Sequence, residues 1–244
     1  MDDALPIIPL VSLALTFVPS ALLIVIMHLW SLKALTAVYA NLRMLVQLLA
    51  IGYVLNYIFE TEQPLIIIAV VVVMIGVSAW IALRPLKTQG ARLYLLSLAA
   101  IGISGLVMLV LITQVTLDMA RWFEPRYVVP LAGMIFANAM NTVSLAAERF
   151  ESEQEREVEY LSARRVALDA ALIPQINALL AVGLVSLPGM MTGQILSGVD
   201  PLIAARYQIM VMCMIFGSAG LAAVIYLALA RPTSNIVGAR PSGR

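Results

Sequence analysis

The sequence predicts an all-α, polytopic membrane protein with about seven transmembrane helices, its N-terminus outside the cell and its C-terminus in the cytoplasm. The prediction rests on the apolar composition, on the recurrence of long apolar runs, and on the distribution of basic residues between loops. Hydrophobic residues make up 62% of the 244 residues and charged residues 12%, with a mean hydropathy of +0.97. Soluble domains carry about half apolar and about a quarter charged residues. So large an apolar excess requires lipid as solvent, which predicts a multi-pass protein of the cell membrane.

Seven apolar stretches have the length of about 20 residues with which a helix crosses a bilayer core of about 30 Å. They cover residues 7–29, 38–59, 65–83, 94–114, 127–147, 171–198 and 206–230. The second stretch holds Arg43 near its start, so its helix could instead begin at Met44. Together the stretches predict a single transmembrane domain over residues 1–230, followed by a disordered cytoplasmic tail over residues 231–244.

The lysines and arginines gather in alternate loops, and this asymmetry predicts the orientation. Twelve of the fifteen belong to one set of loops and the C-terminal tail, and only Arg121, Arg126 and Arg206 belong to the other set. Because positive charge favours cytoplasmic loops, the first set is expected in the cytoplasm. The first apolar run follows Asp2 and Asp3 rather than a basic segment, so we interpret it as a span and not as a signal peptide.

Residues 147–169 differ in composition from the spans and predict a cytoplasmic, acidic helical connector. The stretch is rich in glutamate and contains no proline or glycine that would end a helix. Arg149–Glu153 at i,i+4 and Glu153–Arg156 at i,i+3 are spacings that bring opposite charges together on a helix. The fifth span is therefore expected to continue into the cytoplasm and to turn near Ser162. Two interpretations stay open: the connector is simply solvated, or its surface binds a cytoplasmic partner.

Several kinds of chemistry are missing from the sequence. Every aspartate and glutamate lies in or at the edge of an expected loop, and the only histidine, His28, lies at the end of the first span. Proton-coupled transporters and intramembrane hydrolases keep ionisable groups at membrane depth, so we predict no catalytic residues and no enzyme. Lys33 and Lys87 both follow leucine, so the chain has no P-loop and is expected to bind no cofactor, ATP included. The residues identify no metal-ligand set, and the net charge of +1 gives no reason to expect a nucleic-acid partner.

The fifth span carries uncharged polar residues at membrane depth, namely Asn138, Asn141, Thr142 and Ser144. Spacings of three and four residues place the first three on one helical face. Because an unpaired amide in lipid is costly, this face is expected to turn inward. Either these residues form hydrogen bonds between helices, or they line a polar translocation path.

The sixth span is interrupted by Pro174 and by the pair Pro188–Gly189. Proline removes a backbone donor and clashes with the preceding turn, so a kink or break is expected there. Broken helices are tolerated inside membranes where they line a cavity, which makes this span part of the candidate translocation path. Its candidate residues carry side-chain oxygens or sulfurs, and the sulfurs suit soft metals: Gln175, Asn177, Met190, Met191, Thr192 and Gln194. The thirteen methionines of the chain are also explained as flexible packing.

Three segments resemble the FetB-like family of iron-export ABC permeases, whose plant relatives are linked to aluminium tolerance. They are Ala170–Leu202, which contains the string GLVSLPGMMTGQIL, then Ala205–Met212 and Gly133–Phe150. The resemblance covers most of the chain and is strongest beyond Val129. It implies that two copies of the permease pair with two cytoplasmic ATP-binding subunits, and that ATP used by these partners drives iron export.

The cytoplasmic segment departs from the family pattern. Ser162 runs almost directly into the basic pair of the next helix, so about 15 residues that relatives carry are missing here. In such permeases this region docks in a groove of the ATP-binding subunit. The resemblance therefore leaves five candidates for this contact: Glu159, Tyr160, Leu161, Arg164 and Arg165.

The residues and the resemblance together predict the permease subunit of an ABC transporter that exports iron or another metal. Iron ordinarily takes carboxylate or imidazole ligands, which the spans lack. Two alternatives stay open. The same fold could export an organic substrate such as a nucleotide sugar or a lipid, or the chain could be a non-transporting membrane protein that recruits a cytoplasmic partner.

Overall fold

The protein is all-helical in the part that its computed structural model describes, residues 8–60 and 63–231. Contacts divide the chain into two compact units, one ending at Glu60 and the other beginning at Thr61. Each unit is described separately, and the single transmembrane domain over residues 1–230 stays a prediction. Of the predicted tail at 231–244, only Arg231 belongs to the described residues.

The first unit is a helical hairpin with a broken first arm. Helices α1 (Leu10–Leu15) and α2 (Val18–Leu29) form one apolar run of 20 residues, and α3 (Ala34–Glu60) follows after a short turn. α2 ends at a left-handed residue, Ser31, with φ 59°, and the next amide bonds back to the Met27 carbonyl. This is a Schellman ending, which lets α3 start four residues before the predicted residue 38. Arg43 consequently lies inside α3 rather than at its start.

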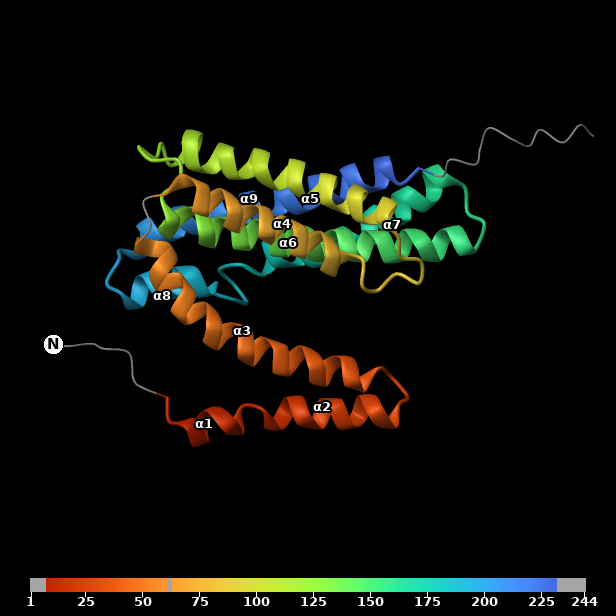
Figure 1. The fold of residues 1–244 in the computed structure, drawn as a ribbon, viewed down its shortest axis with the longest axis horizontal. Helices are drawn as coiled ribbons and strands as arrows, with labels where there is room; N and C mark the ends of the chain where they lie inside the picture. Colours follow the sequence, from red (N-terminus) through yellow and green to blue (C-terminus); the bar gives the residue numbers. More distant parts are fainter. Residues whose placement is uncertain (1–7, 61–62, 232–244) are drawn as a thin grey trace, which may run out of the picture. The chain divides into compact units, whose positions relative to one another are not determined.

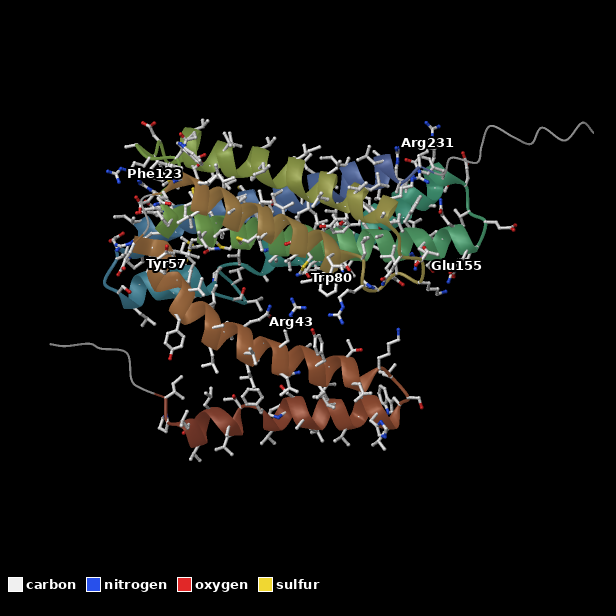
Figure 2. The ribbon with its side chains drawn as sticks, viewed as in Figure 1. Arg43, Tyr57, Trp80, Phe123, Glu155 and Arg231 are labelled. Atoms are coloured by element: carbon white, nitrogen blue, oxygen red, sulfur yellow. The ribbon has the colours of Figure 1, made fainter. Side chains whose placement is uncertain are left out.

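The second unit is a bundle built around α6 (Figure 1). Its long helices α4 (Pro64–Ala82), α5 (Ala91–Val110), α6 (Pro125–Glu155), α7 (Tyr160–Ala181) and α9 (Pro201–Leu229) lie side by side, with α6 packed against the other four. α5 continues into a π-helical segment, η1 (Leu111–Thr116), and a short helix α8 (Gly189–Leu196) precedes α9. Figure 2 shows Glu155 and Arg231 at one end of this bundle and Phe123 at the other.

The helices of the bundle approach closely because small residues line their contacts. Alanines at 79, 100, 132, 139, 146, 167, 171, 204 and 219 are fully buried. Small side chains allow the close van der Waals packing that holds membrane helices together without a hydrophobic driving force. Gly105 on α5 shows how tight the fit is, because a Cβ there would overlap the Phe136 ring of α6.

The turn between α6 and α7 comes earlier than the sequence predicts. α6 ends at Glu155, and Glu157 adopts φ 59° so that the Val158 amide reaches the Glu153 carbonyl at 3.2 Å. A Schellman ending normally uses glycine at the left-handed position, and a glutamate there gives no signal in the sequence. The turn therefore lies at 156–159, and the expected turn near Ser162 is wrong, because Ser162 lies inside α7.

The predicted sixth span, 171–198, is not one helix. α7 runs through Pro174 and ends at Ala181, seven residues before Pro188, and Pro188 instead starts α8. The segment between α7 and α8 forms a turn closed by a backbone hydrogen bond, in which the Val185 amide donates to the Ala181 carbonyl at 2.8 Å. Gly183 in this turn adopts φ 81°. The break thus lies at 182–188, and Pro174 does not interrupt the helix. The remaining six predicted spans overlap helices long and apolar enough to cross a membrane.

α7 and α8 together run the length of the bundle against α9. At one end the Tyr160 hydroxyl of α7 donates to the Leu227 carbonyl near the end of α9, at 2.9 Å. At the other end α8 lies beside the start of α9, where both helices line one cavity. The broken pair is therefore an antiparallel partner of α9, joined to it by a tight turn. Gly198 ends α8 with φ 85°, and Asp200 caps α9 through the Leu202 amide at 2.8 Å.

Candidate translocation site

We name the two ends of the second unit by their side chains. The acidic end carries Glu151, Glu155 and the start of α7, and the cavity end carries Arg126 and Tyr207. The sequence-based orientation predicts the acidic end in the cytoplasm and the cavity end outside.

A chain of hydrogen bonds joins α7 to α6 near the middle of the bundle. The buried Gln175 amide donates to the Thr142 hydroxyl at 3.1 Å, and this hydroxyl donates to the Asn138 carbonyl at 3.0 Å. The Asn138 amide in turn donates to the Met134 carbonyl at 2.8 Å. Three of the predicted path residues thus satisfy one another or their own backbone. Only the bond from Gln175 to Thr142 joins two helices, and such a bond contributes about 0.6 kcal/mol on average in membrane proteins. The other two lie within α6.

Two further amides face away from the bundle. Asn141 on α6 and Asn177 on α7 are exposed, and neither side chain has a hydrogen-bond partner among the described residues. Thr142 and Gln175 pair on the same two antiparallel helices. With a rise of 1.5 Å per residue, Asn141 and Asn177 therefore lie within about 2 Å of one another in depth. Ser144, one turn from Asn141, is half-buried. α6 and α7 thus each carry, at similar depth, an amide that the described residues of the second unit leave uncovered.

A cavity of about 410 Å³ opens at the cavity end between α6, α8 and α9. Its lining residues are Leu117, Arg126, Tyr127, Pro130, Leu131, Met134, Met190, Gln194, Val199, Tyr207 and Met210. Of the predicted path residues, only Met190 and Gln194 line it. Thr192 instead donates to the Pro188 carbonyl at 3.1 Å, and Met191 is half-buried outside the cavity lining.

Two buried carboxamide oxygens lack partners at this end of the molecule. They are Oε1 of Gln194 on α8 and Oε1 of Gln208 on α9. A buried acceptor without a donor costs about 1–3 kcal/mol, so each requires a ligand, a water or a functional reason. Gln208 is 5% exposed, and the sequence analysis did not single it out. Its signal was present as an amide in the apolar run that follows Arg206.

The cavity offers a particular set of donors to a ligand. It has three thioether sulfurs, two phenols, one amide and one guanidinium, and it has no carboxylate or imidazole. In the described part of the chain, no three His, Cys, Asp or Glu residues come together in a way that could hold a metal ion. A site for a hard metal is therefore not built from these described residues, whereas neutral soft donors are gathered in one place.

At the acidic end, α6 holds the turn between α4 and α5. The Glu151 carboxylate accepts from the backbone amides of Lys87 and Thr88, each at 3.0 Å, and from the Thr88 hydroxyl. The Lys87 ammonium binds Glu155 at 2.7 Å, and this contact raises the pKa of Lys87 above its usual value. We call Glu151 and Glu155 the carboxylate clamp. The predicted pairs Arg149–Glu153 and Glu153–Arg156 are also present in the structure.

Tyr160, one of the five predicted contacts for an ATP-binding subunit, is engaged within the chain. Its hydroxyl bonds to Leu227, its ring meets Phe150 edge-on at 5.9 Å, and the guanidiniums of Arg164 and Arg231 lie 5.6 Å from its centre. Tyr160 therefore ties α6, α7 and α9 together and is half-buried. The other four candidates, Glu159, Leu161, Arg164 and Arg165, are exposed.

Comparison with known proteins agrees with this architecture. Residues 10–234 match the family described as uncharacterised protein family UPF0014. The probable iron export permease protein FetB of Escherichia coli is 37% identical over 199 residues, covering 75% of each chain. The UPF0014 membrane protein slr1647 of Synechocystis is 36% identical over 192 residues, covering 72% of this chain and 74% of the relative. The protein ALUMINUM SENSITIVE 3 of Arabidopsis thaliana is 28% identical, covering 80% of this chain and 76% of the relative. No solved structure matches the chain.

Proposed function

Because the chain belongs to the UPF0014 family of membrane proteins, we propose that it is the membrane-spanning permease subunit of an ABC transporter that exports a metal. The observation that carries the proposal is the broken α7–α8 pair, whose short helix places Met190 and Gln194 in the cavity between α6 and α9. Discontinuous helices that line a cavity are a common way to build transport sites. The name of the relative FetB makes iron the first metal to test.

Energy has to come from another chain. The sequence has no P-loop, and Lys87, one of its two lysines, is paired with Glu155. We propose that a cytoplasmic ATP-binding subunit docks at the acidic end and hydrolyses the ATP. Leu161 is 55% exposed there, next to the exposed cations Arg164 and Arg165. This combination offers an apolar anchor flanked by charge, as protein interfaces use.

Contacts at the acidic end connect the proposed docking surface to the helices of the bundle. Tyr160 connects the start of α7 to the ends of α6 and α9, and the carboxylate clamp connects α6 to the α4–α5 turn. A displacement of the α7 start by a partner would therefore move several helices together. We propose this connected end as the element that transmits the ATP cycle, with the shortened segment acting through Leu161, Arg164 and Arg165.

We further propose that two copies of the permease meet on the face that carries Asn141 and Asn177. Exposing these amides to lipid is unfavourable, because a bilayer core offers them no hydrogen-bond partner. In a two-fold dimer with its axis along the membrane normal, each residue faces residues of its own depth in the second copy. Since Asn141 and Asn177 lie at one depth, amide would meet amide, and each carboxamide can both donate and accept.

One observation favours a second candidate substrate class. The cavity lining is mostly apolar, and its one charged residue, Arg126, is a cation. An organic molecule with an anionic group would fit such a lining, and hard Fe(II) or Fe(III) would not find its preferred oxygen and nitrogen ligands. The same permease exporting an organic substrate therefore remains the alternative function.

The proposal is tested by co-purification and by stimulated ATPase activity. Tagged chain extracted from native membranes is expected to capture an ATP-binding subunit, and a Leu161→Asp, Arg164→Glu variant is expected to lose it. Ala120→Ser, an exposed change at the cavity end, serves as the control and should retain the subunit. In reconstituted vesicles, stimulation of ATP hydrolysis by iron salts or by organic anions would separate the two substrate classes. A chain that never captures an ATPase would refute the proposal.

A further inference from the structure

Each of the three helices that line the cavity contributes one methionine and at least one polar side chain to it. α6 contributes Tyr127 and Met134, seven residues apart, and α9 contributes Tyr207 and Met210, three residues apart. α8 contributes Met190 and, one turn further along, Gln194. Met134 and Met210 are half-buried, whereas Met190 is 37% exposed. Three thioethers from three helices thus line one cavity.

From this arrangement we infer that the cavity between α6, α8 and α9 binds a soft monovalent cation, of the Cu(I) or Ag(I) type, through Met134, Met190 and Met210. Thioether sulfur is a soft, neutral donor that prefers soft d¹⁰ cations over the harder Fe(II) or Mg(II). A ligand set without a negative charge suits a cation of charge one, because a divalent ion would be left uncompensated in the low-dielectric interior.

Gln194 adds a second, independent observation. Its Oε1 is buried without a hydrogen-bond partner, and Gln194 lies four residues from Met190 on the same face of α8. An unpaired carboxamide oxygen among the lining residues is suited to accept from a cation-bound water or to ligate the cation directly. α8 itself is only eight residues long and is bounded by Pro188 and Gly198.

Arg126 lines the same cavity and is the one full charge among its lining residues, but it is exposed, so its guanidinium stays hydrated. The helical rise between Arg126 and Met134 is about 12 Å, and this separation weakens the repulsion of a cation at the sulfurs. A solvated cation at the mouth instead favours outward release of a positively charged cargo. The inference deepens the proposed export function by naming the cargo class, and it rests on that function only for the direction of transport.

The binding test uses the full chain in lipid nanodiscs with Ag(I), which is redox-stable, in chloride-free buffer. The variant carries Met134→Leu, Met190→Leu and Met210→Leu, since leucine keeps the volume and removes the sulfur. Met212→Leu is the matched control, because Met212 is half-buried on α9 and does not line the cavity. The triple variant is expected to lose at least about tenfold in Ag(I) affinity, or 1.4 kcal/mol, and its silver–sulfur X-ray absorption signal. The control is expected to keep both.

Equal Ag(I) affinity of wild type and triple variant would overturn the inference, as would an equal loss in Met212→Leu. If the triple variant unfolds, the three single variants replace it, and each is expected to weaken binding several-fold at an unchanged melting temperature. ATPase activity that iron stimulates equally in wild type and triple variant, without Met-dependent Ag(I) binding, would overturn this inference and leave the proposed function standing. Met-dependent Ag(I) binding by a chain that captures no ATPase would support the site and refute the proposed function.

Discussion

The two ends of the α4–α9 bundle differ in how their polar side chains are paired. At the acidic end, Glu151 accepts three hydrogen bonds, Lys87 pairs with Glu155, and Tyr160 bonds to Leu227. Two buried atoms there that lack hydrogen bonds, Arg149 Nε and Glu153 Oε1, belong to side chains that form an ion pair with each other. At the cavity end, Gln194 and Gln208 keep buried oxygens with neither a hydrogen bond nor an ion pair among the described residues, and α8 lines a cavity with α6 and α9. Polar side chains at the acidic end therefore connect helices, whereas these two amide oxygens have no partner in the described part of the chain.

The contrast distinguishes polar groups that stabilise the fold from polar groups that serve function. Groups that are satisfied internally stabilise the folded state, and their removal should cost stability. Groups that are buried and unsatisfied destabilise the folded state, and their removal should increase stability at the expense of function. The two ends therefore respond with opposite sign to the same kind of substitution, and four measurements follow, in decreasing order of expected effect.

The largest effect is expected from Glu151→Ala. It leaves two backbone amides of the α4–α5 turn and the Thr88 hydroxyl without their acceptor, at a cost of about 2–3 kcal/mol for hydrogen bonds to a charged group. The melting temperature in detergent should fall, and amide exchange over residues 84–90 should accelerate. Glu148→Ala on the same helix is the control, since Glu148 is exposed and makes no hydrogen bond or ion pair among the described residues. Similar losses in both variants would show that the clamp does not hold the turn.

The opposite sign is expected from Gln208→Met at the cavity end. Gln208 is 5% exposed with an unpaired Oε1, and methionine matches its shape while removing the orphan acceptor. The variant should gain about 1–2 kcal/mol in stability, read as a higher melting temperature, because the buried acceptor without a donor is removed. A lower melting temperature would mean that the oxygen has a partner that stabilises the protein, and the contrast between the ends would fail.

The sequence predicts the acidic end and the cavity end to different depths. Six of its seven apolar runs coincide with helical runs long and apolar enough to cross a membrane, because the length of a lipid-spanning helix is visible in the length of its apolar stretch. The i,i+4 and i,i+3 pairs around Glu153 were also predictable, since they need only a helix. What escaped is non-local or conformational. The clamp joins residues 64 positions apart, and the turn at Glu157 uses a residue with no preference for positive φ.

The sequence predicts where a polar site lies in the chain, but it does not predict which residues line it. Polar residues in the fifth and sixth spans pointed to a site there, yet sequence spacing could not tell an amide bonded to its own helix from an exposed one. Asn138 is satisfied by Met134, whereas Asn141, three residues on, faces outward. The sequence predicts a break near Pro188, but the helix ends earlier, at Ala181. The amides of residues 184–186 all donate to the Ala181 carbonyl, so the chain turns before it reaches the proline. Met134 and Met210 lie on helices that sequence spacing alone could not bring together.

A smaller loss is expected from Tyr160→Phe. The substitution removes the hydrogen bond to the Leu227 carbonyl and keeps the ring against Phe150 and the two arginines, so about 1 kcal/mol of stability should be lost. Tyr160→Ala should lose more, because it also removes the aromatic and cation–π contacts. Thermal unfolding of the three proteins gives the ranking. If phenylalanine proves as costly as alanine, the hydroxyl rather than the ring is what joins α7 to α9.

The smallest effect is expected for the hydrogen bond from Gln175 to Thr142, which lies midway between the two ends of the bundle. A double-mutant cycle with Gln175→Leu and Thr142→Val isolates their coupling, which should be about 0.6 kcal/mol, the average for hydrogen bonds within membrane helices. Transport should be unaffected, because both side chains are buried and lie outside the cavity lining. A coupling above about 2 kcal/mol, or a variant that folds normally but no longer transports, would move this pair from the structural class into the path. The functional region would then extend from the cavity to the middle of the bundle, and Asn138, which lies between them, would have to be counted in it.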